Sequence, residues 1–125
     1  MSKTLDPKCP VARTLDIIGE RWTILILRDL FMLGPRRFQD LQNSLSGIAP
    51  NTISARIKTL EEAGVVTREL YSEHPPRAIY SLTERGQALK PALLALRDWG
   101  EAYTEGPPAP RVTDANRIES PVTVD

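Results

Sequence analysis

Apolar side chains recur at helical spacing over most of the first 63 residues of the chain. This spacing predicts helices over residues 9–19, 20–33, 38–45 and 50–63. Prolines stand at the start of two of these helices and glycines follow three of them, as is common at helix ends. The second helix is apolar on most of its sides, which is typical of the buried centre of a small helical domain.

The pattern changes to that of β-strands after Gly64. Residues 65–71 and 78–82 are rich in β-branched and aromatic side chains, and two consecutive prolines lie between them. This predicts two strands joined by a turn over residues 72–77. A helix followed by such a hairpin is the second half of a winged helix-turn-helix, in which residues 36–63 carry the helix-turn-helix pair.

A last helix is predicted to begin after Thr83, whose hydroxyl suits an N-cap, and to continue to about residue 103. Its apolar side chains recur at spacings of three and four residues. They are Leu89, Leu93, Leu96, Trp99 and Tyr103. One small core does not need so long an apolar stripe, so a partner helix is expected.

Length and composition indicate one domain, because 125 residues are too few for two domains of ordinary size. Residues 1–8 are interpreted as an N-terminal arm, residues 9–105 as the domain, and the proline-rich residues 106–125 as a disordered tail. The longest apolar run, residues 22–27, is far shorter than the roughly 18 residues of a membrane span. No signal peptide is visible, so a cytoplasmic protein that does not contact a membrane is expected.

Net charge and side-chain content exclude several classes of function. The 16 basic and 16 acidic residues give no net charge, which does not favour nucleic-acid binding unless the basic residues cluster. The chain has one cysteine, Cys9, and one histidine, His74, so an internal disulfide and a multi-cysteine metal site are excluded. There is no glycine-rich phosphate loop. We therefore expect neither an enzyme nor a metal or other cofactor.

The predicted 50–63 helix has a small, polar face opposite its apolar stripe. Side chains on this face could meet base edges and phosphates, and the N-terminal N–H groups could bind a phosphate. The candidates are Pro50, Asn51, Thr52, Ala55, Lys58 and Thr59. Arg56 lies nearer the apolar stripe, where it can pair with an acid of the fold. The alternative is that the polar face is only a solvated helix surface.

Three further arginines lie beside the predicted reading elements. Arg36 and Arg37 precede the third helix, and Arg77 follows the two prolines of the hairpin. Guanidinium groups held in this way suit phosphates or a narrow minor groove. The alternative for Arg77 is a surface ion pair with Glu69 or Glu73.

Six ordered motifs resemble the HxlR family of bacterial winged helix-turn-helix transcription regulators, relatives of the MarR group. They span residues 9–12, 18–28, 34–38, 60–68, 75–77 and 80–86, within a match that covers residues 9 to about 103. The resemblance implies a homodimer, built mainly from the first and last helices, that binds a two-fold symmetric operator near a promoter. The expected dimer contacts are Val11, Leu15, Leu89, Leu93, Leu96, Trp99 and Tyr103.

Some members of that family sense electrophiles or oxidants through a cysteine at the start of the first helix, and Cys9 occupies this place. The helix N-terminus, Lys8 and Arg13 would favour its reactive thiolate. The alternative is a small buried residue that packs the first helix.

The expected function is that of a dimeric DNA-binding repressor. Trp22, Trp99 and Tyr103 could line a pocket for a small aromatic effector, but aromatic side chains at helical spacing are more often core, and we favour core. Two alternatives stay open. One is a winged helix used for protein contact, and the other is a ligand-responsive regulator without thiol sensing.

Overall fold

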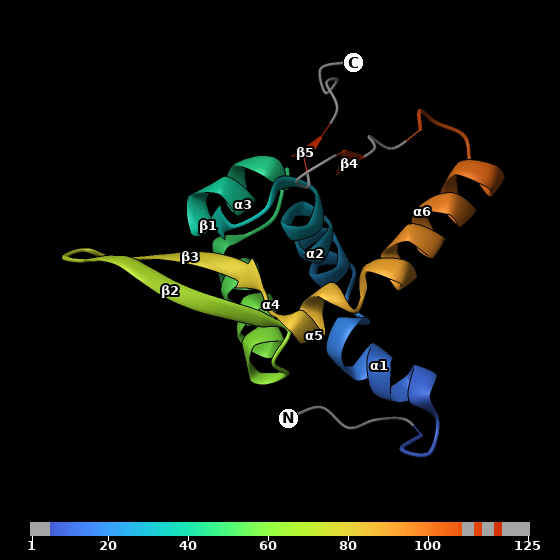
Figure 1. Cartoon of the computed structure of the whole chain (residues 1–125), viewed down its shortest axis with the longest axis horizontal. Coiled ribbons are helices and arrows are strands. Elements are labelled where there is room, and N and C mark those ends of the chain that lie inside the picture. The colour runs from blue at the N-terminus through green and yellow to red at the C-terminus, as the bar shows by residue number, and fades with distance from the viewer. Residues whose placement is uncertain (1–5, 109–111, 114–116, 119–125) are drawn as a thin grey trace.

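The structure, a computed structural model, describes residues 6–108, 112–113 and 117–118. The helices are α1 (Pro10–Ile18), α2 (Arg21–Leu33), α3 (Phe38–Ser44), α4 (Pro50–Glu62), α5 (Glu84–Gln87) and α6 (Lys90–Tyr103). The strands are β1 (Arg36–Arg37), β2 (Val66–Glu73), β3 (Pro76–Leu82), β4 (Val112–Thr113) and β5 (Arg117–Ile118). The predicted fold class, mainly α with a small β-hairpin wing in a winged helix-turn-helix, is confirmed (Figure 1).

The apolar core lies where α2, α3 and α4 meet. Its most deeply buried side chains are Ile26, Leu27, Leu41, Ile53 and Leu60. Burying each of these side chains contributes roughly 1.5–3 kcal/mol. The N-terminus of α2 is capped by the carboxylate of Glu20, which accepts hydrogen bonds from the backbone N–H groups of Trp22 and Thr23.

The end of α4 fixes where the wing begins. Gly64 has φ 77°, a left-handed conformation that side chains disfavour. The Arg85 guanidinium donates a hydrogen bond to the Ala63 carbonyl at 2.8 Å, and the Thr83 hydroxyl donates one to the Gly64 carbonyl at 2.6 Å. These contacts tie the start of α5 to the end of α4, so the wing between them has both its ends anchored.

The wing is longer than the sequence predicts. Strands β2 and β3 pair antiparallel from Val66↔Leu82 to Glu73↔Pro76, so the turn is reduced to two residues. The first residue of a strand tolerates proline, and for this reason Pro76 does not end the pairing. Strand β1 was not predicted. It pairs with β3 on the other side and gives the sheet order β1-β3-β2.

The single last helix of the prediction is two helices in the structure. Thr83 caps α5 as expected, accepting a hydrogen bond from the Gly86 N–H, but α5 ends at Gln87. Pro91 in the first turn of α6 explains the break, because proline has no N–H to donate to the Gln87 carbonyl and its ring crowds the preceding turn. The chain therefore changes direction before α6.

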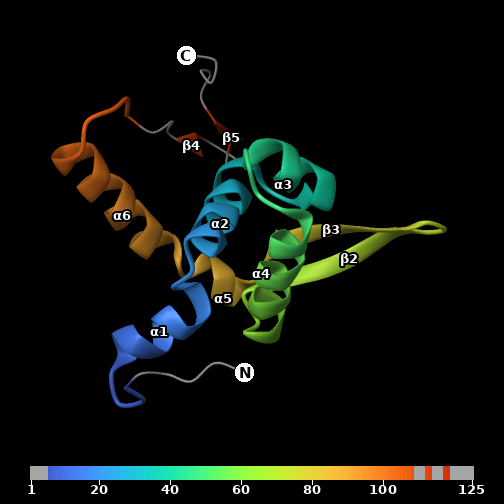
Figure 2. The ribbon, with the colours of Figure 1, turned by 180° about the vertical axis from the view of Figure 1, so that it is seen from behind.

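The two ends of the molecule carry different elements. The wing projects from one end, with α4 beside its base, whereas α1 and α6 project from the other end and diverge from one another (Figure 1, Figure 2). The predicted tail over residues 106–125 lies mostly outside the described residues. Within it, β4 pairs with β5. Of the predicted arm, only residues 6–8 are described.

Candidate nucleic-acid interface

Helix α4 presents a polar face to solvent. Its predicted apolar stripe, Ile53, Ile57 and Leu60, is buried in the core. Of the candidate DNA contacts, Pro50, Asn51, Ala55 and Lys58 are exposed, and Thr52 and Thr59 are half-buried. All six therefore remain accessible along one side of the helix.

Ser54 is an exposed residue of this face that the sequence interpretation left out. It stands three residues after Asn51 and four before Lys58, a spacing that places it on the same side of the helix. Helical spacing alone is enough to assign Ser54 to the exposed face. Arg56, by contrast, turns toward the fold as expected, and its Nε lies 4.0 Å from Glu20 Oε1.

Arg37 is held at the start of α3 while staying accessible. Its Nε and Nη2 donate to the two carboxylate oxygens of Asp40 at 3.0 and 2.8 Å, and its backbone N–H donates to the same carboxylate. The Arg37 side chain is still 53% exposed. A two-point contact of this kind fixes the plane of the guanidinium group.

The contact between Arg37 and Asp40 predicts a loss of stability in acid. Hydrogen bonds from the Arg37 side chain and backbone lower the pKa of Asp40 to about 2. Because the folded pKa lies below the unfolded value of about 3.8, this stabilisation is complete above that value and is lost as pH falls through about 2. NMR titration of the Asp40 carboxyl should show a midpoint near 2, and Asp40→Asn should remove this part of the acid dependence of unfolding. A midpoint near 3.8 would contradict the assignment.

Arg36 turns inward rather than toward solvent. Successive side chains of a strand point to opposite faces, so β1 exposes Arg37 and half-buries Arg36. The Arg36 Nη2 lies 3.9 Å from Asp29 Oδ2 and donates to the Asp40 main-chain carbonyl. This orientation does not support the predicted contact of Arg36 with DNA, whereas the contact of Arg37 remains a prediction.

A groove of about 490 Å³ lies between the wing and the start of α3. Three guanidinium groups line it, those of Arg37, Arg68 and Arg77, together with Tyr71 and Tyr80. No ion pair holds Arg77 among the residues that the structure describes, so the alternative pairing with Glu69 or Glu73 is not formed. Arg68, one of the basic residues that the sequence places in or beside the reading elements, pairs with Glu61 at 3.6 Å and is more than half exposed.

The opposite end of the molecule exposes apolar side chains on two helices. They are Val11 and Leu15 on α1, and Leu96, Trp99 and Tyr103 on α6. The preference for Trp99 and Tyr103 as core is therefore wrong, although Trp22 does pack against the core. Of the other expected dimer contacts, Leu89 and Leu93 are half-buried against the chain's own core.

A second groove, of about 480 Å³, lies between α2 and α6, on the side of α6 away from Trp99. Its walls are mainly apolar and include Leu25, Phe31 and Leu93. None of Trp22, Trp99 and Tyr103 lines it, so the effector pocket considered from the sequence is not formed by those aromatic side chains.

Cys9 is the N-cap residue of α1 and is half-buried. Its side chain makes no capping hydrogen bond. Arg13 donates to the Pro7 carbonyl at 2.6 Å, which folds its guanidinium back over the segment that precedes Cys9. No group of three or more histidine, cysteine or acidic side chains in the described part of the chain could hold a metal ion. No helix there is long and apolar enough to cross a membrane.

A winged helix-turn-helix that presents the polar face of its second reading helix belongs to the class of DNA-binding transcription regulators. The model of the HxlR-like helix-turn-helix family matches residues 17–107, and the chain belongs to this family.

Similar proteins agree with this assignment. YdeP of Bacillus subtilis, an HTH-type transcriptional regulator, is 40% identical over 97 residues, which cover 78% of this chain and 75% of YdeP. The structure of the redox regulator HypR in its reduced form has a TM-score of 0.70 and 35% identity, covering 75% of this chain and 92% of HypR. The reduced form of the regulator YodB from B. subtilis has a TM-score of 0.64 and 32% identity, covering 78% of this chain and 95% of YodB.

Proposed function

We propose that the chain is a homodimeric repressor that binds a near-palindromic operator with two α4 helices in successive major grooves. The observation that carries the proposal is the separation of two surfaces. The polar face of α4 and the wing lie at one end, and the exposed apolar side chains of α1 and α6 lie at the other. A two-fold axis at the apolar end would relate the two α4 helices, which must lie about one duplex turn apart, roughly 34 Å, to enter successive major grooves.

The face of α4 suits direct reading of bases. Asn51 and Ser54 have short side chains that can hydrogen-bond to base edges, and Lys58 can reach a phosphate or a guanine. Exposure on one helix face lets the three residues enter a single groove together. Sequence preference would come from Asn51 and Ser54, while Lys58 would add affinity.

The wing groove would supply contacts to the DNA backbone. Arg37, Arg68 and Arg77 bring three guanidinium groups to one groove of a chain that has no net charge, and such clustering supports nucleic-acid binding. Arg37 and Arg68 each pair with one acidic residue, whereas no ion pair holds Arg77 among the described residues. Phosphates are recognised by such guanidinium groups, whichever bases lie beside them.

Arg77→Ala should weaken binding to all DNA sequences alike. Because the variant can no longer neutralise a phosphate, the slope of log affinity against log salt should fall by about one unit. Fluorescence anisotropy across a salt series measures this slope, with Glu73→Gln on the same wing as a control. An unchanged slope would contradict a contact between Arg77 and a DNA phosphate.

The dimer would use the exposed side chains of both projecting helices. On α6, the rings of Trp99 and Tyr103 contact one another with centroids 5.3 Å apart, and the exposed Leu96 stands three residues before Trp99, at the edge of the groove between α2 and α6. Large exposed apolar groups on neighbouring turns are uncommon on a monomer and typical of an interface. Repression then needs only the reading elements and these helices, because a dimer seated on a promoter blocks access to it.

The chain's own upstream DNA tests the proposed function. A gel shift with this DNA should show binding that falls steeply with salt, and footprinting should show a two-fold protected region. No shift even at low salt would instead favour a winged helix used for protein contact.

Control by Cys9 is a second part of the proposal. Its half-buried thiol stands at the N-terminus of α1, the helix that carries the expected dimer contacts Val11 and Leu15, and the similar protein HypR is known in reduced and oxidised forms. The Cys9 thiolate would add to a ring carbon of a quinone, forming a carbon–sulfur bond as a ring double bond is lost, and the quinone oxygens would take up protons to give a hydroquinone thioether. Hypochlorite would take two electrons from two Cys9 thiols, one per subunit, giving a disulfide, chloride and water.

Cys9→Ser should abolish the response of DNA binding to quinone and hypochlorite while leaving binding by the untreated protein unchanged. Mass spectrometry of Cys9 after exposure, paired with the gel shift, measures both effects. A Cys9→Ser protein that still responds fully would refute thiol sensing and favour a regulator that responds to a ligand or to no signal.

A further inference from the structure

A carboxylate lies inside the apolar part of α2. Asp29 is only 3% exposed, and its neighbours on the helix include the core residues Ile26 and Leu30. Its Oδ1 accepts a hydrogen bond from Arg28 Nη2 at 3.1 Å, whereas its Oδ2 is buried without a hydrogen-bond partner among the described residues. Burial of a carboxylate costs free energy, and an apolar side chain of similar size would often be no less stable here.

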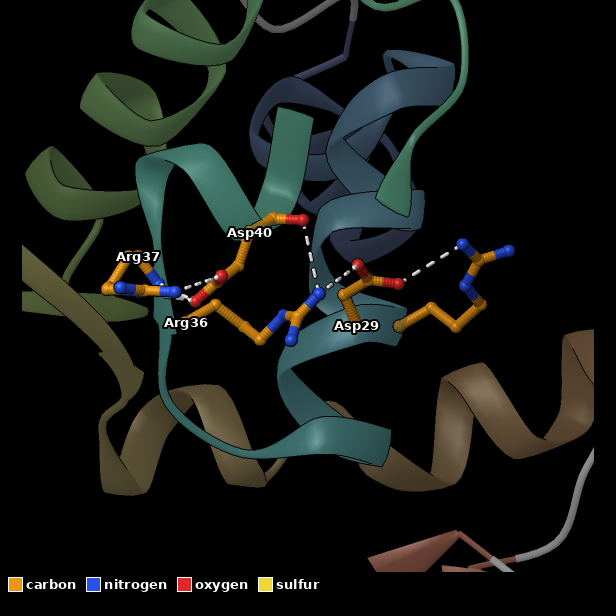
Figure 3. A network of polar contacts seen from close by, with 5 residues as sticks. Asp29, Arg36, Arg37 and Asp40 are labelled. Carbon is orange, nitrogen blue, oxygen red and sulfur yellow. Dashed lines mark hydrogen bonds and ion pairs between the residues drawn. The ribbon is translucent and has the colours of Figure 1, made fainter. Parts of the chain in front are cut away.

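Arg36 connects this carboxylate to α3 and to the wing, the elements that are proposed to contact DNA (Figure 3). Its Nη2 lies 3.9 Å from Asp29 Oδ2 and donates to the Asp40 main-chain carbonyl at 3.1 Å. The backbone of Arg36 also pairs with Tyr80 of β3. One half-buried residue is therefore in contact with the core helix, the first turn of α3 and the wing.

Asp40 connects Arg36 to the exposed Arg37. The Asp40 main-chain carbonyl accepts a hydrogen bond from Arg36, and both Asp40 carboxylate oxygens accept hydrogen bonds from the Arg37 guanidinium. Figure 3 shows Arg36 between Asp29 and Asp40, with Arg37 on the far side of Asp40. The order of contacts from core to surface is thus Asp29, Arg36, Asp40 and Arg37.

We propose that Asp29 is a positioning residue for DNA binding, because through Arg36 it fixes the first turn of α3 and the direction of Arg37. The inference rests on the proposed function, since Arg37 faces the wing groove assigned to phosphates. The apolar core sets how closely α2 and α3 pack, but apolar contacts have no direction. The charged contact adds the orientation that a guanidinium needs to meet a phosphate.

The test compares operator affinity and its salt slope in the full-length protein. The operator is first selected from a random duplex pool by the wild-type protein. The variants are Asp29→Asn, Arg36→Met and the double variant. Ile26→Val, which removes one methylene from the same helix, is the control for a purely structural loss of stability. Circular dichroism and sedimentation confirm folding and assembly before each titration.

Asp29→Asn should lower operator affinity about tenfold and reduce the salt slope by about one unit for each phosphate that Arg37 no longer neutralises. The double variant should bind no more weakly than Arg36→Met, because both changes remove the same interaction. Ile26→Val should leave the slope unchanged.

Three results would overturn the inference. They are an Asp29→Asn affinity within twofold of wild type, a lower affinity with an unchanged slope, and full additivity in the double variant. If Asp29→Asn does not fold, Arg36→Met decides, because methionine removes the charged contact with Asp29 and keeps an unbranched side chain. Wild-type affinity and slope in Arg36→Met would overturn the inference. Failure of the wild-type protein to select any DNA would instead contradict the proposed function itself.

Discussion

Trp99→Glu should convert the protein from the proposed dimer to a monomer and lower its affinity for operator DNA about a hundredfold or more. Trp99 is 62% exposed within the apolar stripe of α6, so the dimer would bury it against the partner helix. A carboxylate there would be desolvated without a partner. Loss of the second reading helix removes the gain from two linked contacts, which is commonly a hundredfold to ten-thousandfold.

Sedimentation and fluorescence anisotropy together measure this effect. Leu33→Glu is the matched control, because Leu33 is an exposed apolar residue at the end of α2 and lies outside both projecting helices. It should leave the dimer and its affinity intact. A Trp99→Glu protein that remains dimeric and binds as wild type would contradict the assigned interface.

Gly86→Ala should destabilise the fold by about 3 kcal/mol. A Cβ at Gly86 would stand 2.2 Å from the Val65 carbonyl oxygen and 3.0 Å from Leu82 Cδ2. The Val65 carbonyl cannot move freely, because it accepts hydrogen bonds from the backbone N–H and the hydroxyl of Thr83. The added methyl group would therefore separate α5 from the base of the wing.

Urea unfolding measures the loss, and Gly100→Ala provides the control. Gly100 lies in α6, where a Cβ would meet no atom within 4 Å, so alanine should leave stability unchanged or raise it by about 0.5–1 kcal/mol through helix propensity. Equal stability of Gly86→Ala and wild type would show that α5 does not pack as described.

The sequence predicts well those features that depend on local spacing. The apolar period and the proline and glycine signals place α1 to α4 and the wing, and the capping threonine places the start of α5. The exposed face of α4 follows from the same period, since its buried stripe fixes which side is left. The break before α6 was also readable, because Pro91 lies within the predicted helix and disrupts a continuous turn.

Features that depend on contacts distant in sequence were not predictable. Strand β1 is too short to show an alternating pattern, and it exists because β3 offers it an edge. The inward orientation of Arg36 follows from that pairing and from its contact with Asp29. Helical spacing alone does not single out Asp29, because α2 is apolar on most of its sides. The exposure of Trp99 could not be distinguished from burial, because an apolar stripe has the same spacing whether it meets its own core or a partner.

The polar face of α4 is central to the proposed function, in which it reads DNA twice in each dimer. Selection of binding sites from a random duplex pool, by wild type and by Asn51→Ala, tests this role most directly. We expect a near-palindrome with half-site centres about 10 base pairs apart, and a preference that changes at one position of each half-site in the variant. An unenriched pool, or the same preference at every position for both proteins, would contradict it.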